Sequence, residues 1–193
     1  GTVLSHLGRM PEALHHCQAS VAHYRPQQHT YFASLFGLDV GVMAQLQEAR
    51  VLWILGRPEA ALTTVDRALT VARELGHPAT RAYALFFASW VHYFRDEPQE
   101  TLERSEEALC YSRENGIQIV DVWATSLNGW AHVRMGDSVQ GIATLQSALD
   151  GQAAMQVRLL RPHFLGLLGE AMAGTGRRER AWELFTTALS ESE

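Results

Sequence analysis

Residues 52–62 read Leu-Trp-Ile-Leu-Gly-Arg-Pro-Glu-Ala-Ala-Leu. An apolar run ends at Gly56, and Pro58 follows where a second helix can begin, because the first helical position tolerates a missing N–H. Further on come Ala68 and Leu69. This stretch therefore predicts the end of one helix, a tight turn and the start of a second helix.

The same pattern recurs at a constant interval along the chain. Gly56, Asp96, Gly136 and Gly176 hold the turn position, with Asp96 in place of a glycine. Each is followed at the same offsets by an apolar residue and then by Ala-Leu. A partial earlier copy begins at Gly8, but the step from Gly8 to Gly56 is longer than the others. An internal period of this size, about 40 residues, predicts an array of helical repeats.

The pattern predicts a single helical-repeat domain over residues 1–193. It has a partial repeat over 1–24, an irregular connection over 25–38, and repeats at about 39–75, 78–115, 117–154 and 157–191. Asp39 is the expected N-cap of the helix that follows the connection. The expected helices are 39–55, 58–75, 78–95, 98–115, 117–135, 138–153, 158–174 and 178–191. Within 25–38, four apolar residues indicate an extra short helix or an extended first turn: Tyr31, Phe32, Leu35 and Phe36.

Small residues distinguish the type of repeat, since HEAT and armadillo units have a similar period and tetratricopeptide (TPR) units a somewhat shorter one. In a TPR unit the helices approach closely at one small residue on the first helix and two on the second. The matching positions here are Ala49, Ser89, Gly129 and Gly169; Ala61, Thr101, Gly141 and Ala181; and Ala68, Ala108, Ala148 and Ala188. We therefore expect an all-α solenoid, a right-handed superhelix of antiparallel TPR-like helix pairs, with Ala68, Ala108 and Ala148 buried.

Composition excludes several classes of protein. The net charge of −5 argues against a nucleic-acid surface, which needs clustered basic residues. No apolar run is long enough for a membrane span. Cys17 and Cys110 form no CxxC pair, which favours a reducing, cytoplasmic compartment over a disulfide framework. All 16 basic residues are arginine, and with the abundant alanine this indicates a bacterial source.

Four segments resemble one family of proteins: 37–42, 52–62, 72–78 and 161–171. They look like the C-terminal helical-repeat region of large bacterial signalling proteins, over about residues 35–190. In those proteins a nucleotide-cyclase domain or a DNA-binding activator domain precedes an ATPase switch domain and the repeats. The resemblance implies a regulatory scaffold. The resemblance implies neither cyclase nor ATPase activity for this chain, because residues 1–193 contain no cyclase or ATPase segment.

Motifs for catalysis or cofactors are absent from the sequence. There is no phosphate-binding GxxxxGK[ST] loop and no HExxH motif, and no Ser/His/Asp set can be assembled. His15, His16 and Cys17 point around a helix rather than to one face. We therefore expect no cofactor, no metal and no enzyme. Catalysis by groove histidines is a minor alternative.

The first helix of each pair should line a concave groove. Its expected residues are Met43, Arg50, Trp53, Tyr83, Phe86, Trp90, Tyr93, Trp123, Trp130, His163 and Glu170. Two interpretations stay open: the rings pack against one another as core, or they form an aromatic groove that grips a ligand. In the second case Trp90 and Trp130 should be partly exposed. Arg50 and Glu170 would give the groove ends opposite charges, and a C-terminal acidic peptide is a poor candidate because a basic cluster is missing.

The sequence thus predicts a protein–protein interaction module that binds a peptide or a partner domain, which includes other domains of the same parent protein. A small-ligand-sensing domain of a transcriptional activator is the alternative function. We also expect an exposed apolar strip on the last helix, formed by Trp182, Phe185 and Leu189. That strip could support a homo-oligomer.

Overall fold

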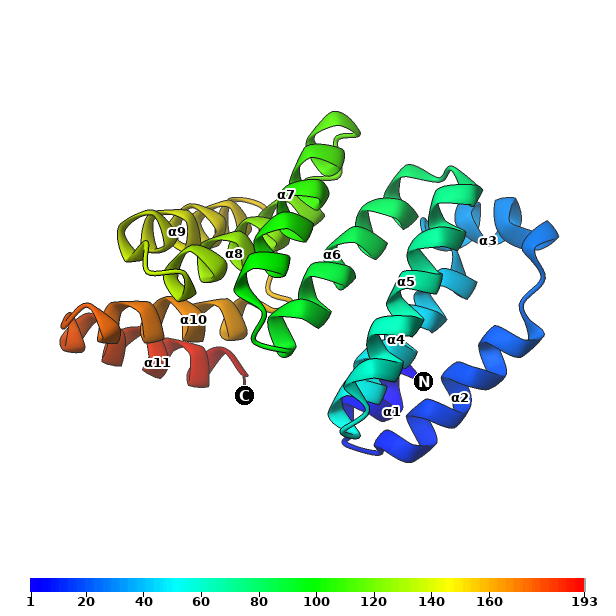
Figure 1. The fold of residues 1–193 in the computed structure, drawn as a ribbon, viewed down its shortest axis with the longest axis horizontal. Helices are drawn as coiled ribbons and strands as arrows, with labels where there is room; N and C mark the ends of the chain where they lie inside the picture. Colours follow the sequence, from blue (N-terminus) through cyan, green and yellow to red (C-terminus); the bar gives the residue numbers. More distant parts are fainter. Residues whose placement is uncertain (193) are drawn as a thin grey trace. The chain divides into compact units, whose positions relative to one another are not determined.

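The computed structural model describes residues 1–192, which are all α-helical apart from their connections. Eleven α-helices and one 3-10 helix cover this part of the chain, and within each part of Figure 1 neighbouring helices run antiparallel. None of the helices within residues 1–192 is both long and apolar enough to cross a membrane.

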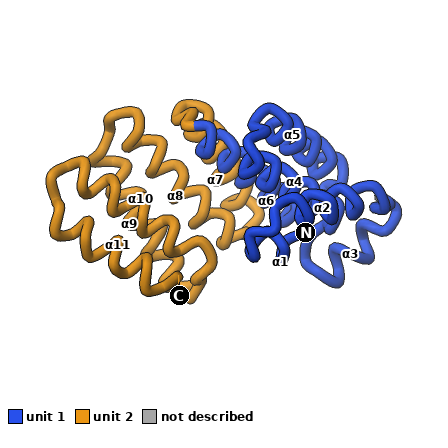
Figure 2. The backbone as a smooth tube through the Cα atoms, turned by 90° about the horizontal axis from the view of Figure 1, so that it is seen from below, with its two compact units in different colours: residues 1–95 blue, residues 96–193 orange. Residues whose placement is uncertain are grey.

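The chain divides into two compact units, residues 1–95 and 96–193 (Figure 2). Unit 1 contains α1 (Thr2–His6), α2 (Met10–His23), the 3-10 helix η1 (Pro26–Gln28), α3 (His29–Phe36), α4 (Val40–Ile54), α5 (Pro58–Leu75) and α6 (Pro78–Phe94). Unit 2 contains α7 (Pro98–Glu114), α8 (Gln118–Arg134), α9 (Ser138–Ala154), α10 (Arg161–Gly174) and α11 (Arg178–Ser192).

The turns between helices follow the predicted repeat period. Gly56, Gly136 and Gly176 have positive φ angles of 74°, 97° and 83°. Asp96 occupies the same position with a φ of 57°, a conformation that aspartate tolerates better than most side chains. Pro58, Pro78 and Pro98 begin their helices, as the sequence predicts. Local turn chemistry therefore sets the helix boundaries in both units.

The small residues lie at the close helix–helix contacts, which confirms the predicted repeat type. Ala68, Ala108 and Ala148 are buried. A Cβ added to Gly129 would lie 2.9 Å from the carbonyl oxygen of Gly141, so α8 and α9 approach backbone to backbone. Within unit 1, three helices fill a core cluster that includes Ala68: α4 supplies Val42, Leu46 and Ala49; α5 supplies Val65, Ala68 and Ala72; and α6 supplies Ala84, Ala88 and Val91.

The helix limits depart clearly from the prediction at α10, which begins at Arg161 rather than near residue 158. Gln156 and Leu160 have positive φ angles of 55° and 65°, so the connection after α9 is a longer turn than the sequence indicates. No glycine or proline within 155–160 signals it. The extra helix expected within 25–38 is present as α3, preceded by η1.

The last helix shows most of the predicted apolar strip. Trp182 and Leu189 are exposed. Phe185, by contrast, is half-buried. Its ring packs against the backbone of Gly169, where an added Cβ would lie 2.6 Å from a ring carbon. The expectation of an exposed Phe185 is therefore wrong, because the small residue on α10 leaves room for the ring.

Candidate functional site

The predicted groove does not present its largest rings to solvent. Trp90 and Trp130 are each 8% exposed, and Trp123 and Phe86 are also buried. The expectation that Trp90 and Trp130 are partly open is therefore wrong. These four rings match the interpretation in which first-helix aromatics are core.

Ring–ring packing explains this burial in unit 1. The Trp90 ring lies edge-on to Phe86, with centroids 5.0 Å apart, and 5.7 Å from Phe94. Phe94 in turn stacks on Trp53 at 5.6 Å with an interplanar angle of 5°. Aromatic pairs in these geometries add to the stability gained by burial. The aromatic rings are thus covered by contacts with one another, and no ligand is needed to bury them.

The other predicted groove residues differ in exposure. Glu170 is exposed, and the half-buried ones are Met43, Arg50, Trp53, Tyr83, Tyr93 and His163. Burial raises the pKa of the Tyr83 hydroxyl and lowers the pKa of the His163 imidazole. Both groups are therefore held in their neutral forms around neutral pH.

Unit 1 contains a cavity of about 460 Å³ on the side of α4 that carries Met43. Its wall comes from α1, α2, η1, α3 and α4, so the irregular connection forms one side. The apolar part of the wall includes Phe32, Val40 and Met43, and the polar part includes Ser20 and Gln47. Such a mixed lining, mainly apolar with a few polar groups, is typical of ligand pockets.

Arg50 lies one helical turn beyond this wall on α4. Its guanidinium donates to Ser5 Oγ at 2.6 Å and to Gln47 Oε1 at 3.2 Å, and Gln47 itself lines the cavity. No carboxylate of the described residues forms an ion pair with Arg50, and burial lowers the pKa of the guanidinium. A half-buried cation without a counter-charge is attractive to an anionic group.

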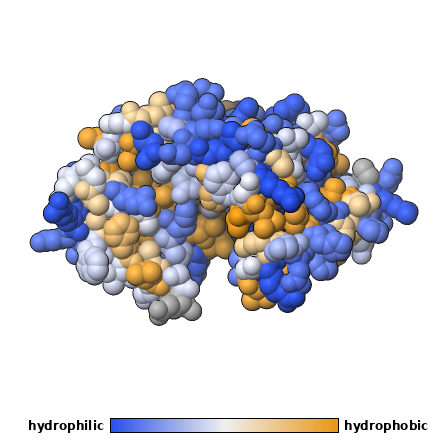
Figure 3. Space-filling view, turned by 60° about the horizontal axis from the view of Figure 1, so that its bottom comes forward, coloured by the Kyte–Doolittle hydropathy of each residue, from blue (hydrophilic) through white to orange (hydrophobic). Residues whose placement is uncertain are grey.

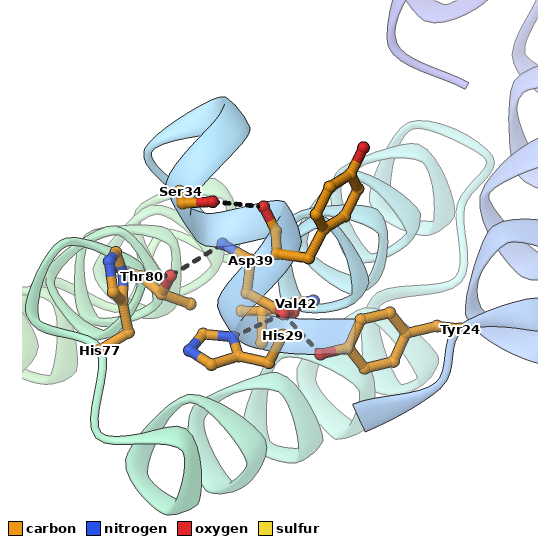
Figure 4. A network of polar contacts seen from close by, with 8 residues as sticks. Tyr24, His29, Ser34, Asp39, Val42, His77 and Thr80 are labelled. Atoms are coloured by element: carbon orange, nitrogen blue, oxygen red, sulfur yellow. Dashed lines mark hydrogen bonds and ion pairs between the residues drawn. The ribbon is translucent and has the colours of Figure 1, made fainter. Parts of the chain in front are cut away.

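A buried polar network holds the connection against the repeats (Figure 4). Asp39 is fully buried; its Oδ1 accepts from the Val42 N–H at 2.8 Å, which makes it the N-cap of α4 as predicted. Its Oδ2 accepts from the Tyr24 hydroxyl at 2.5 Å and lies 2.9 Å from His29 Nδ1. The Asp39 N–H donates to Thr80 Oγ1 at 2.9 Å. Asp39 therefore links three parts of unit 1: the residues on either side of η1, the start of α4, and α6.

This network also fixes the cavity wall. Tyr24 lines the cavity and its ring packs against Gly41, where an added Cβ would lie 2.6 Å from ring carbons. Burial raises the pKa of the Tyr24 hydroxyl, and the hydrogen bond to Asp39 raises it further. The tyrosine therefore stays a neutral donor to the carboxylate, and the wall keeps its position.

Of the cavity wall, only Met43 is among the groove residues that the sequence predicts. Tyr24, Phe32 and Gln47 are not among them, and the sequence does not predict the contacts of His29 and Thr80 with Asp39. The one available signal was the longer step before Gly56, which located the irregular connection. Spacing alone does not say which side chains from that connection meet.

Within the described residues, no three His, Cys, Asp or Glu side chains are arranged to hold a metal ion. His15 and His16 are exposed neighbours on α2, and Cys17 is buried in the cavity wall. On the face shown in Figure 3, hydrophobic residues gather in separate patches between hydrophilic ones. The cavity of unit 1 is therefore suited to binding a ligand through its shape and its apolar wall, with Arg50 as the nearby cation.

A tetratricopeptide repeat family matches residues 42–67, which cover most of α4 and the first half of α5. The fold is a TPR-like helical repeat. No curated protein matches the chain. TPR-like repeat domains generally serve as protein-interaction scaffolds, and the comparisons identify no enzyme family.

Solved structures share this TPR-like fold at low identity. The apo form of RapI has a TM-score of 0.65 at 15% identity, over 78% of this chain and 55% of that one. A Rap protein complexed with competence and sporulation factor has a TM-score of 0.63 at 15% identity, over 99% and 61%. A signal transduction ATPase with numerous domains and a tetratricopeptide repeat sensor, from Pyrococcus horikoshii, has 0.56 at 18% identity, over 78% and 24%. The chain therefore spans less than two thirds of each of these proteins.

Proposed function

We propose that this TPR-like module binds a peptide or a partner domain through the α4 side of unit 1, within a bacterial signalling or regulatory protein. The observation that carries this proposal is the cavity of about 460 Å³ with Met43 in its wall. It replaces the wider aromatic groove, because the rings expected to form that groove are buried. The proposed binding surface is thereby confined to the wall formed by α1, α2, η1, α3 and α4.

The cavity wall favours a ligand with an apolar side chain as its anchor. Phe32 and Met43 offer adaptable apolar contact, since a thioether fills irregular gaps and an aromatic ring gives a large contact area. Gln47 and Ser20 can bond to backbone groups of an extended segment. Beyond Gln47, Arg50 provides a counter-charge for one acidic group of the ligand.

The comparisons support a role of this kind. One neighbour is a Rap protein complexed with competence and sporulation factor, and another carries a tetratricopeptide repeat sensor within a signal transduction ATPase. In such an arrangement, ligand binding to the repeats would shift the state of an attached effector domain. In this proposal the chain is the part that binds the ligand, and the effector domain is the part that responds.

The test uses a phage-displayed library of random peptides, selected on the wild-type chain. We expect enriched peptides with an apolar anchor, and binding weakened at least about tenfold by Met43→Glu, since a carboxylate would enter the apolar wall. Met135→Glu is the matched control, because Met135 is an exposed methionine of unit 2. Failure to enrich any peptide, or equal binding by both variants, would refute the proposal.

A small-ligand sensor is the second candidate. The observation that favours it is the cavity volume, which lies within the range of about 300–1,000 Å³ typical of small-molecule sites. A thermal-shift screen of small molecules separates the two. Stabilisation that Met43→Glu abolishes, without any peptide enrichment, would assign the cavity to a small molecule instead of a peptide.

A further inference from the structure

Unit 2 contains a hollow of about 330 Å³ between two of its helices, named here the α9–α10 hollow. Its α9 wall begins at Ser138 and continues along one face of the helix with Val139, Ile142, Ala143 and Gln146. Met172 and Thr175 of α10 form the other wall, and Arg177 of the following turn completes the lining. These residues belong neither to the predicted aromatic groove nor to the cavity of unit 1.

The α9–α10 hollow lies between two internal helices of the array. The equivalent surface one repeat earlier lies between α7 and α8, and its residues Gln99, Glu103, Glu106 and Met135 are exposed. Three further helices, α9, α10 and α11, follow that surface in the chain and leave it uncovered. The open position of the hollow is therefore a property of this place in the repeat.

The α9 face differs in charge from its repeat equivalents. The second helices of the other three complete repeats each carry two carboxylates at the positions that match Val139, Ala143 and Gln146. These are Glu59 and Asp66 on α5, Glu103 and Glu106 on α7, and Glu179 and Glu183 on α11. The α9 positions carry no charge, and Val139 is 83% exposed. An exposed valine contributes little to the core, so the uncharged face is better explained by contact with a ligand.

Two arginines lie beside this uncharged face. Arg177 Nη1 donates to Met172 Sδ, a weak acceptor, at 3.7 Å, and Arg178 is the next residue. Neither forms an ion pair with a carboxylate of residues 1–192, whereas Arg180 pairs with Glu183 at 2.6 Å. Arg177 and Arg178 are both exposed, and both line an adjoining hollow of about 450 Å³. This arrangement complements a ligand that has an apolar group next to negative charge.

We propose that the α9–α10 hollow is a docking site for an acidic segment of a partner protein. The segment inserts an apolar side chain between α9 and α10 and places its carboxylates beside Arg177 and Arg178. The volume lies at the lower end of the range of about 300–1,000 Å³ typical of ligand pockets, so it suits an anchor of one or two side chains. Ser138 and Gln146 offer polar groups to the backbone of the segment. The proposal does not depend on the cavity of unit 1.

The chemistry of the α9–α10 hollow predicts how binding responds to salt. Arginine and carboxylate form charge-assisted hydrogen bonds, but exposed pairs of this kind are weak and are screened by salt. Burial of the apolar anchor is not screened in this way. Affinity should therefore be modest and should fall as salt rises, without being abolished.

The test titrates the full chain against labelled twelve-residue peptides and measures fluorescence polarisation up to about 1 mM protein. Each peptide has one leucine, methionine or phenylalanine in a glycine–serine background, with two aspartates placed one to four residues to either side. We expect at least one peptide to bind. Its affinity should fall at least about tenfold when serine replaces the apolar residue, and at least about fivefold when asparagines replace the aspartates.

Three variants that change the net charge by the same amount locate the site. Val139→Glu gives α9 the carboxylate that α5 has at Glu59, and Arg177→Gln removes one cation; each should weaken binding at least about fivefold. Arg158→Gln is the matched control, because Arg158 is an exposed arginine just before α10 without an ion pair among the described residues. All three side chains are exposed, so each variant should keep the circular dichroism and melting temperature of the wild type.

Four results would overturn the proposal. The first is that no peptide binds the wild type, and the second is that Arg158→Gln weakens binding as much as Arg177→Gln does. The third is equally tight binding of a peptide without an apolar residue or of a twelve-nucleotide single-stranded DNA, which would mean that the arginines attract any anion. The fourth is binding that Met43→Glu abolishes and Val139→Glu does not. That result would place the peptide in the cavity of unit 1, so it would support the proposed function while refuting this site.

Discussion

Unit 2 follows the repeat period almost without interruption, whereas unit 1 accommodates the irregular connection between α2 and α4. In unit 2 the close contacts are made by glycines such as Gly129 and Gly141. In unit 1 the departure from the period is held by the buried carboxylate of Asp39 and its partners. Where the period holds, small residues are sufficient to place the helices, and where it fails, a specific polar network takes over.

The largest effect should come from Asp39→Ala. The change removes the N-cap of α4 and leaves the Tyr24 hydroxyl and His29 without their acceptor. Losing a cap costs about 1 kcal/mol and an unsatisfied buried polar group about 1–3 kcal/mol, so the free energy of unfolding should fall by about 3 kcal/mol. Urea denaturation followed by circular dichroism measures it.

The control for this change is Asp137→Ala in unit 2. Asp137 caps α9 by accepting from the Gln140 N–H at 3.0 Å, but it is exposed. Its removal should cost only about 1 kcal/mol. Equal losses at the two positions would mean that Asp39 acts as an ordinary cap and that the network does not hold the connection.

Two glycines of unit 2 should respond to replacement by alanine with changes of opposite sign in the free energy of unfolding. Gly129→Ala places a Cβ 2.9 Å from the Gly141 carbonyl oxygen, so overpacking should lower the free energy of unfolding by about 1–3 kcal/mol. At Gly166 on α10 an added Cβ would have no atom within 4 Å apart from its chain neighbours and the backbone of its own helix. The better helix propensity of alanine should therefore raise the free energy of unfolding of Gly166→Ala by up to about 1 kcal/mol. Thermal melting of both variants would reveal whether the repeat seam is as close as described; a stabilised Gly129→Ala would contradict it.

Two half-buried arginines extend the comparison. In unit 2, Arg161 pairs with Glu191 at 3.2 Å and bonds to the Leu149 carbonyl, so Arg161→Met should cost about 1.5 kcal/mol. In unit 1, the partners of Arg50 among the described residues are all neutral. Arg50→Met should therefore change the free energy of unfolding by less than about 1 kcal/mol. The pair is compared by urea denaturation. A larger loss at Arg50 than at Arg161 would show that Arg50 serves the fold rather than a ligand.

The smallest expected difference concerns the two thiols. Cys110 in unit 2 is exposed, whereas Cys17 in unit 1 is buried, so a thiol reagent should label Cys110 in the folded protein and Cys17 only after unfolding. The hydrogen bond to Glu114 and its negative charge raise the pKa of Cys110. Labelling of Cys110 should therefore accelerate at a higher pH than for an ordinary thiol. Glu114→Gln should move that pH downward, and an unchanged profile would contradict the contact.

The elements that the sequence predicts well are those with local causes. Turn glycines, helix-starting prolines and the small residues that recur with the repeat period each act through their own backbone or nearest neighbour. The open or closed state of the first-helix aromatics could not be predicted in this way. Whether Trp90 meets solvent depends on how Phe86 and Phe94 pack around it, which the spacing of residues does not encode. The partners of Asp39 and the turn at Leu160 likewise depend on tertiary contacts or lack a turn-forming residue.

The constant step of the turns and seams has a consequence for how such a chain can change length. A duplication of one whole period brings its own left-handed turn and its own small residues, so the added helices would find a matching neighbour at once. An insertion of any other length shifts every later side chain around its helix and must be absorbed in a connection, as the additional residues before Gly56 are. Engineered copies of this protein should therefore tolerate the addition of one whole period after Gly136 far better than an addition one helical turn shorter or longer.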